Sequence, residues 1–135
     1  MRLDLALLAD AATVDGSGKL NILGIFDHIA AASFPARHEH MCLVMRFSAA
    51  ASDAGEHQVL VAVRDPEEEE LARMSGSLDL GPSGGVEGVR IPHVLWLNGF
   101  VFPQPGVYAV EISIDGEVAG TLSLRLSRAP RIPQA

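Results

Sequence analysis

The densest group of side chains that could bind a metal is a short histidine segment near residue 40. His38 and His40 flank Glu39, and a further histidine, His28, lies upstream. In a β-strand, His38 and His40 would point to the same face, as two ligands of one metal ion must. This segment is therefore the first candidate for a catalytic or metal site.

Metal-dependent β-barrel enzymes of the cupin type use such an H-x-H pair, but the surrounding spacing departs from theirs. The glycine expected before the first histidine falls at Ala32, and the glutamate expected after the second falls at Leu43 or Val44. We therefore expect a polar surface turn that leads into a buried strand, with no metal and no cofactor. The alternative is a small-ligand-binding or metal-dependent, cupin-like β-barrel enzyme that uses His38 and His40.

No motif for nucleophilic catalysis or phosphate binding is complete. The single cysteine, Cys42, lies in an apolar segment without a neighbouring base, which is typical of a buried, unreactive thiol. The G-x-S-x-G turn of serine hydrolases is absent, and the glycines of residues 81–88 lack the Gly-Lys-Ser/Thr of a P-loop. Four glutamates at residues 67–70 predict a solvated turn rather than a calcium site or a short helix. The sequence therefore identifies no catalytic residue.

The remaining candidate for function is an apolar surface around the chain's only tryptophan. Trp96, Phe100 and Phe102 lie within seven residues, and both alternating sets of this segment are apolar. A core strand is one interpretation, and an oligomer interface or hydrophobic groove is the other. Because residues 43–47 and 59–63 are also apolar on both faces, one sandwich cannot bury every face. We therefore expect a homo-oligomer, most simply a two-fold dimer, with Trp96, Phe100 or Phe102 near the contact.

The elements that must position these residues are strands, because apolar residues recur with period two between turn signals. Strands are expected within residues 3–7, 19–26, 41–47, 59–63, 74–78, 89–102, 107–114 and 121–126. No helical pattern alternates with them, which excludes a parallel α/β sheet. The pattern predicts an all-β fold, a single antiparallel β-sandwich (jelly-roll or immunoglobulin-like) of about eight strands. It would span residues 1–128, with a loose tail at residues 129–135.

Glycine and proline make the local predictions specific. Residues 15–18 and 115–116 carry the residue types of hairpin turns. Gly120 predicts a bulge or a close backbone approach within a strand. The long segment at residues 89–102 is expected to break near Pro92 and again at residues 98–99.

Composition limits the class of protein. The chain has 135 residues, 48% of them hydrophobic, enough for one domain with its own core. Ten basic and 17 acidic residues give a net charge of −7, which argues against nucleic acid and anionic membranes as partners. No apolar stretch approaches the roughly 18 residues of a spanning helix, and Asp4 and Asp10 bracket the N-terminal apolar run. We expect a cytoplasmic protein that associates with itself and possesses no disulfide.

Two blocks of sequence resemble a group of small uncharacterised bacterial proteins, a domain of unknown function. The segments LDLALLADAA (residues 3–12) and LNILGIFD (residues 20–27) are similar to the group's N-terminal hairpin. FPQPGVY (residues 102–108), running to IDG (residues 114–116), is similar to its last hairpin. The resemblance implies a single all-β domain and no assigned activity. From the residues we predict a non-enzymatic binding or assembly module, which binds its own copies or another protein.

Overall fold

The computed structural model describes residues 1–81 and 88–130, and within them the regular structure is eleven strands and one 3-10 turn, η1 (Ala51–Asp53). The strands are β1 (Arg2–Val14), β2 (Leu20–Phe26), β3 (His28–Ala31), β4 (Ala36–His38), β5 (Cys42–Ala49), β6 (Gly55–Arg64), β7 (Glu70–Leu80), β8 (Val89–Trp96), β9 (Phe100–Phe102), β10 (Gly106–Ile114) and β11 (Glu117–Arg128). The all-β prediction is confirmed. The described part contains no helix long and apolar enough to cross a bilayer.

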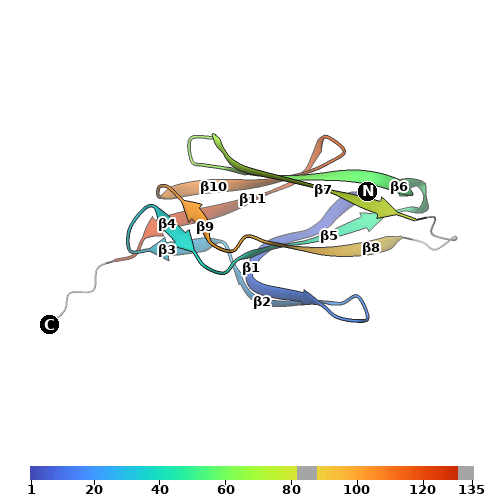
Figure 1. The fold of residues 1–135 in the computed structure, drawn as a ribbon, viewed down its shortest axis with the longest axis horizontal. Helices are drawn as coiled ribbons and strands as arrows, with labels where there is room; N and C mark the ends of the chain where they lie inside the picture. The colour runs from blue at the N-terminus through green and yellow to red at the C-terminus, as the bar shows by residue number, and fades with distance from the viewer. Residues whose placement is uncertain (82–87, 131–135) are drawn as a thin grey trace.

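The strands form two larger sheets and one small one. Sheet A has the order β2-β1-β5-β8, and sheet B has the order β3-β11-β10-β6-β7 (Figure 1). Strands β4 and β9 pair separately. The expectation of purely antiparallel pairing is wrong at one place, because β3 runs parallel to β11. This strand has only four residues, too few to give a period-two signal, and assignment as a jelly-roll or immunoglobulin-like sandwich stays a prediction.

Sheet A curls because β1 belongs to two ladders that follow one another. Its first part pairs with β5, with a register shift between Leu3 and Leu5, and its last part pairs with β2. Strand β1 bends between these parts, so that the end of the β1–β2 hairpin lies beneath β5 and β8 (Figure 1). Contacts between β1 and β8, which are not neighbours in the sheet order, agree with this bend. The sheet therefore forms a half-barrel.

The curl explains why β5 is apolar on both faces. Leu43 and Phe47 enter the main core between the sheets, whereas Cys42 and Val44 belong to a second, smaller core. That second core also contains Ala9 and Ala12 of β1, and β2 side chains pack against it. The apolar face that the sequence left unassigned is thus covered by the chain's own hairpin.

Most local turn predictions are confirmed. Asp115 and Gly116 have φ of 51° and 85°, as a two-residue hairpin turn requires. At Gly120 the ladder between β10 and β11 shifts register, and an added Cβ would lie 2.9 Å from Leu3 Cδ2. The first three glutamates of residues 67–70 lie in a turn closed by the hydrogen bond from Asp65 N–H to Glu69 O, 2.8 Å, and the fourth begins β7. The structure therefore has both the bulge and the close approach, and a turn in place of a helix.

The predicted break at Pro92 is wrong. Strand β8 runs through Pro92, which pairs with Arg46 of β5. Because β8 lies at the end of sheet A, proline can occupy it without removing a needed ladder hydrogen bond. The second predicted break is confirmed: β8 ends at Trp96, and Gly99 has φ of 72°. The predicted loop at residues 81–88 and the tail at residues 129–135 fall mostly outside the described residues.

Candidate functional site

The histidines near residue 40 do not converge. His38 lies in β4, and its ring packs at a centroid distance of 5.6 Å against Phe26. His40 follows the end of β4 and is exposed, so the two side chains do not share a strand face. His28 is on β3, where its Nε2 lies 2.6 Å from Ser127 Oγ. Within residues 1–81 and 88–130, no group of three metal-binding side chains occurs.

Cys42 has the environment of an inert thiol. It is fully buried in the second core, and its Sγ lies 3.5 Å from the carbonyl oxygen of Ala9. Burial, and to a smaller extent the negative charge of Asp10, raise the pKa of Cys42 above its usual value. A raised pKa leaves less thiolate, which is the nucleophilic form.

The three aromatic residues predicted near an interface lie in different environments. Phe102 is only 1% exposed and packs edge-on against Tyr108 in the main core, so its side chain cannot reach a partner. Phe100 is half-buried beside it, with ring centroids 4.9 Å apart. Trp96 is 48% exposed at the end of β8. Of the three, Trp96 is the one that presents a large apolar surface to solvent.

A larger exposed apolar surface lies on β2. Leu23 is 71% exposed and Ile25 is 64% exposed, and the outer edge of β2 has no strand beside it in sheet A. Between them Gly24 has φ of 73°, and a Cβ there would collide with the Asp10 carboxylate. We define the β2 edge as Leu20–Phe26, with Leu23 and Ile25 as its exposed side chains.

Among the end strands of the two large sheets, β2 differs in having neither charge, proline nor short length to protect it against pairing, and Gly24 is its one irregular position. Natural edge strands carry charges, prolines or bulges, or are very short. Strand β7 carries both acidic and basic side chains, β8 carries Arg90 and Pro92, and β3 has four residues. Strand β2 has seven residues, with neither charge nor proline. The sequence alone did not predict this edge, although residues 20–26 show its apolar, uncharged composition.

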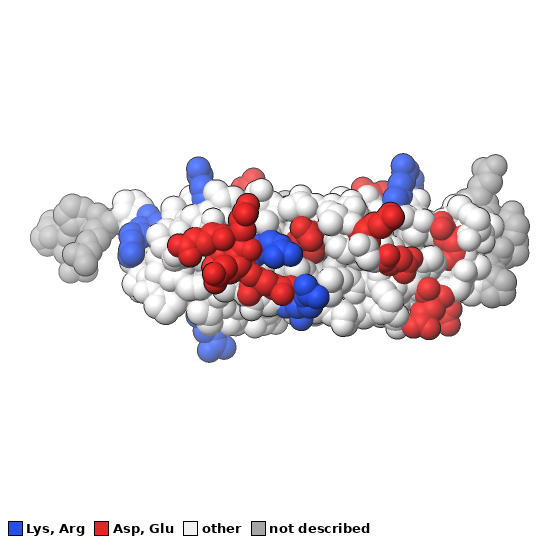
Figure 2. Space-filling model, turned by 90° about the horizontal axis from the view of Figure 1, so that it is seen from above, with Lys and Arg blue, Asp and Glu red and all other residues white. Residues whose placement is uncertain are grey.

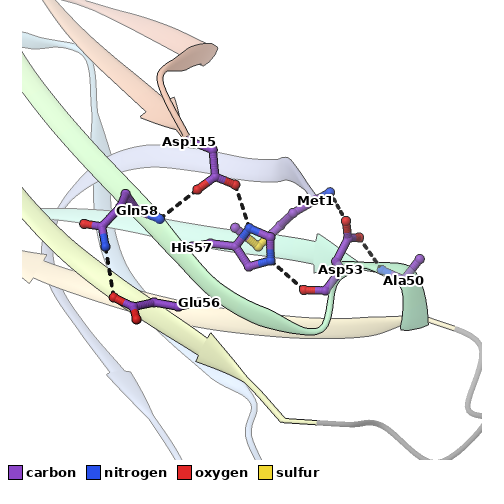
Figure 3. A network of polar contacts seen from close by, with 7 residues as sticks. All are labelled: Met1, Ala50, Asp53, Glu56, His57, Gln58 and Asp115. Atoms are coloured by element: carbon purple, nitrogen blue, oxygen red, sulfur yellow. Dashed lines mark hydrogen bonds and ion pairs between the residues drawn. The ribbon is translucent and has the colours of Figure 1, made fainter.

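A polar network joins the β10–β11 turn, η1 and the Met1 ammonium to β6 (Figure 3). His57 on β6 lies with Nδ1 2.6 Å from Asp115 Oδ2 and Nε2 2.5 Å from the carbonyl oxygen of Asp53. The other Asp115 oxygen accepts the backbone N–H of Gln58 at 2.9 Å, and Asp53 forms an ion pair with the Met1 ammonium at 2.9 Å. The network ties the β10–β11 turn and η1 to β6.

The acceptors around His57 determine its charge. A carboxylate and a carbonyl oxygen can only accept, so both ring nitrogens must donate, which requires the imidazolium form. The Asp115 hydrogen bond, followed by that to Asp53, raises the pKa of His57. The same bond to His57 is the main reason why the pKa of Asp115 is lowered. With both nitrogens occupied, His57 has a structural role rather than that of a general base.

The surface charge agrees with the composition. Figure 2 looks down on the molecule from the side of sheet B, and carboxylates outnumber basic side chains on that face. The basic side chains lie singly, several of them beside carboxylates, instead of in one continuous patch. An extended anionic partner would find no basic surface on this face.

The comparisons with known proteins give a family and no activity. Residues 4–127 match the sequence profile of a family described as a family of unknown function (DUF6941). No curated protein matches the chain. The matched range includes all of the strands except the outermost residues of β1 and β11.

Proposed function

The chain belongs to this family of unknown function, and from its geometry we propose that it is a non-enzymatic assembly module whose copies associate through the β2 edge. The observation that carries the proposal is a seven-residue, uncharged, proline-free edge strand with Leu23 and Ile25 exposed. A two-fold axis would place one β2 antiparallel to its copy, which continues sheet A from one protomer into the next.

The energy of the exposed side chains supports a reversible dimer. Fully burying a leucine or isoleucine contributes about 1.5–3 kcal/mol, so four such side chains, already about one-third buried, contribute at most about 4–8 kcal/mol. Association costs about 4–15 kcal/mol in lost freedom of motion. The side chains alone offset only the lower part of that range. Backbone hydrogen bonds along the paired edges supply the remainder, which gives an affinity sensitive to single charges at Leu23 or Ile25.

Trp96 marks the alternative contact. Pairing across sheet A aligns Trp96 with Cys42, Cys42 with Ala9, and Ala9 with Ile25. Trp96 and Ile25 therefore lie at the two ends of one cross-strand row, on different edge strands. A dimer through β2 leaves Trp96 in solvent, whereas a dimer through β8 covers it.

Sedimentation velocity over a range of protein concentrations tests the proposal. We expect a concentration-dependent dimer in the unmodified chain and a monomer in the Leu23→Glu/Ile25→Glu variant. Val107→Glu is the matched control, because Val107 is a 53% exposed apolar residue on β10, distant in sequence and in another sheet. It should leave the dimer unchanged.

The fluorescence of Trp96, the chain's only tryptophan, separates the two contacts. Iodide quenching that does not change with protein concentration supports pairing through β2. Quenching that decreases as the dimer forms assigns the contact to β8 and contradicts our choice of edge. A monomer at every concentration would overturn self-assembly altogether.

A further inference from the structure

A cavity of about 90 Å³ opens between the two large sheets, on the side where β7 and β8 face each other. In the described chain, no strand pairs with the outer edge of either strand, so this side of the sheets is open. The described residues around the cavity include no Asp, Glu, Lys or Arg. Its lining comprises Met45, Phe47, Val59, Val61, Met74, residues 75–77, Leu78, His93 and Leu95.

Gly76 leaves one position in the β7 wall of the cavity without a side chain. It pairs with Val59, and its neighbours in the alternation, Met74 and Leu78, pack against the main core. Side chains of directly paired residues share a face, so a side chain at Gly76 would point into the space between the sheets. No heavy atom lies within 4 Å of a Cβ there, and φ of Gly76 is outside the left-handed range. Neither crowding nor the backbone therefore requires glycine at this position.

His93 occupies the corresponding position on the opposite strand. It pairs with Met45, while Ile91 and Leu95, two residues to either side, pack against the main core. The alternation thus directs His93 toward the cavity, yet its side chain is largely exposed at the open edge. Gly76 and His93 thus occupy two positions at which apolar side chains would otherwise fill the space between the sheets.

The lining determines the class of ligand. An apolar cavity of about 150 Å³ holds a benzene molecule, so a cavity of about 90 Å³ suits an apolar group of about three or four carbons. The walls are mostly apolar and therefore favour apolar groups, and two methionines can adapt to the shape of such a group. At the mouth, the His93 imidazole and the backbone groups of β7 that point away from β6 offer hydrogen bonds to one polar group.

We infer that this cavity binds a short aliphatic molecule of about three or four carbons that carries one oxygen-containing head group, an alcohol or a carboxylate. The tail occupies the space left by Gly76, and the head group hydrogen-bonds to His93 at the mouth. This inference is independent of the β2 edge, because the cavity is lined by β5, β6, β7 and β8.

Titration with isobutanol and with isobutyrate, followed by amide shifts in ¹H–¹⁵N spectra, tests the inference on the full chain. We expect saturable shifts centred on residues 74–78 and 93–95 for at least one probe, and the stronger probe identifies the head group. Gly76→Val should weaken binding by about tenfold or more, because its methyl groups take the place of the tail. His93→Leu should weaken it while leaving the tail's space open.

Gly81→Val is the matched control, because Gly81 is another glycine with open space around its Cβ, just after β7. It should bind both probes like the unmodified chain. The inference is overturned if neither probe gives saturable shifts, or if Gly76→Val binds as tightly as Gly81→Val. The same titration of the Leu23→Glu/Ile25→Glu variant shows whether the cavity binds the probes when the protein does not associate. The two proposals can therefore be contradicted independently.

Discussion

Replacing Gly76 with valine should stabilise the protein, because this glycine leaves an inward-facing position of β7 empty. No heavy atom lies within 4 Å of an added Cβ, and the backbone at Gly76 is outside the left-handed region. The partner residue on β6, Val59, occupies the same face, so the new side chain would point between the sheets. β-Branched side chains also suit the pleated, half-buried surface of a strand.

Two contributions give the magnitude. Removing a glycine from a strand interior contributes about 0.5–1 kcal/mol. Fully burying a valine side chain contributes at least about 1.5 kcal/mol, of which about half applies where the cavity is open to solvent. The sum is a gain of about 1–2 kcal/mol in the free energy of unfolding. For 135 residues, an unfolding entropy of about 2.1 cal/mol/K per residue converts this gain into a rise in Tm of about 4–7 °C.

Calorimetry and urea titration measure this change. The urea midpoint should rise while the m-value stays the same, since the surface exposed on unfolding hardly changes. Gly81→Val, which adds the same atoms outside the strand, should change Tm little. If Gly76→Val instead lowers the free energy of unfolding by about 1 kcal/mol or more, the neighbouring side chains already fill the space, and the cavity has been misinterpreted.

Three further predictions concern single side chains. Tyr108→Phe should lower the free energy of unfolding by about 1–3 kcal/mol in urea titrations, since it removes an O–H that donates to Gln104 O at 2.6 Å and accepts Gln104 N–H at 3.1 Å; an unchanged midpoint would contradict this. Burial raises the pKa of Tyr108, the only tyrosine, by more than its hydrogen bond to Gln104 lowers it. The absorbance of Tyr108 should therefore titrate above the usual pKa of about 10 until denaturant restores that value. The stabilising contribution of His57, whose folded pKa is raised, should be complete below about pH 6.5 and be lost as pH rises through the folded pKa. The difference in unfolding free energy between the unmodified chain and Asp115→Asn should therefore shrink at alkaline pH, and a constant difference from pH 5 to 9 would show that His57 is not charged there.

The parts of the fold that the sequence predicted are those that local chemistry determines. Positive φ at Asp115 and Gly116 follows from the residue types of a two-residue turn, and alternation correctly predicted that both faces of residues 43–47 are apolar. The bend of β1 and the parallel pairing of β3 with β11 depend on contacts between distant segments. No local pattern encodes those contacts, so the prediction of one simple antiparallel sandwich came out too regular.

The functional residues were harder to predict because exposure depends on sheet order. An uncharged apolar strand such as Leu20–Phe26 is the composition expected of a central strand, and it becomes an exposed edge only once β2 is known to lie at the end of sheet A. Gly76 has the same ambiguity, because a glycine within a strand more often marks a bulge than a missing core side chain.

The curl of sheet A also changes the argument for association. The sequence favoured a dimer because β5 and the segment around Trp96 are apolar on both faces. Yet the hairpin covers the second face of β5, and Phe102 lies in the main core. These apolar faces therefore do not need a partner chain to cover them. What does favour one is the outer side of the same hairpin, because folding it beneath β5 buries Ala12 and leaves Leu23 and Ile25 in solvent. The β1–β2 hairpin thus completes the core within one chain and also forms the apolar edge through which we expect two chains to associate.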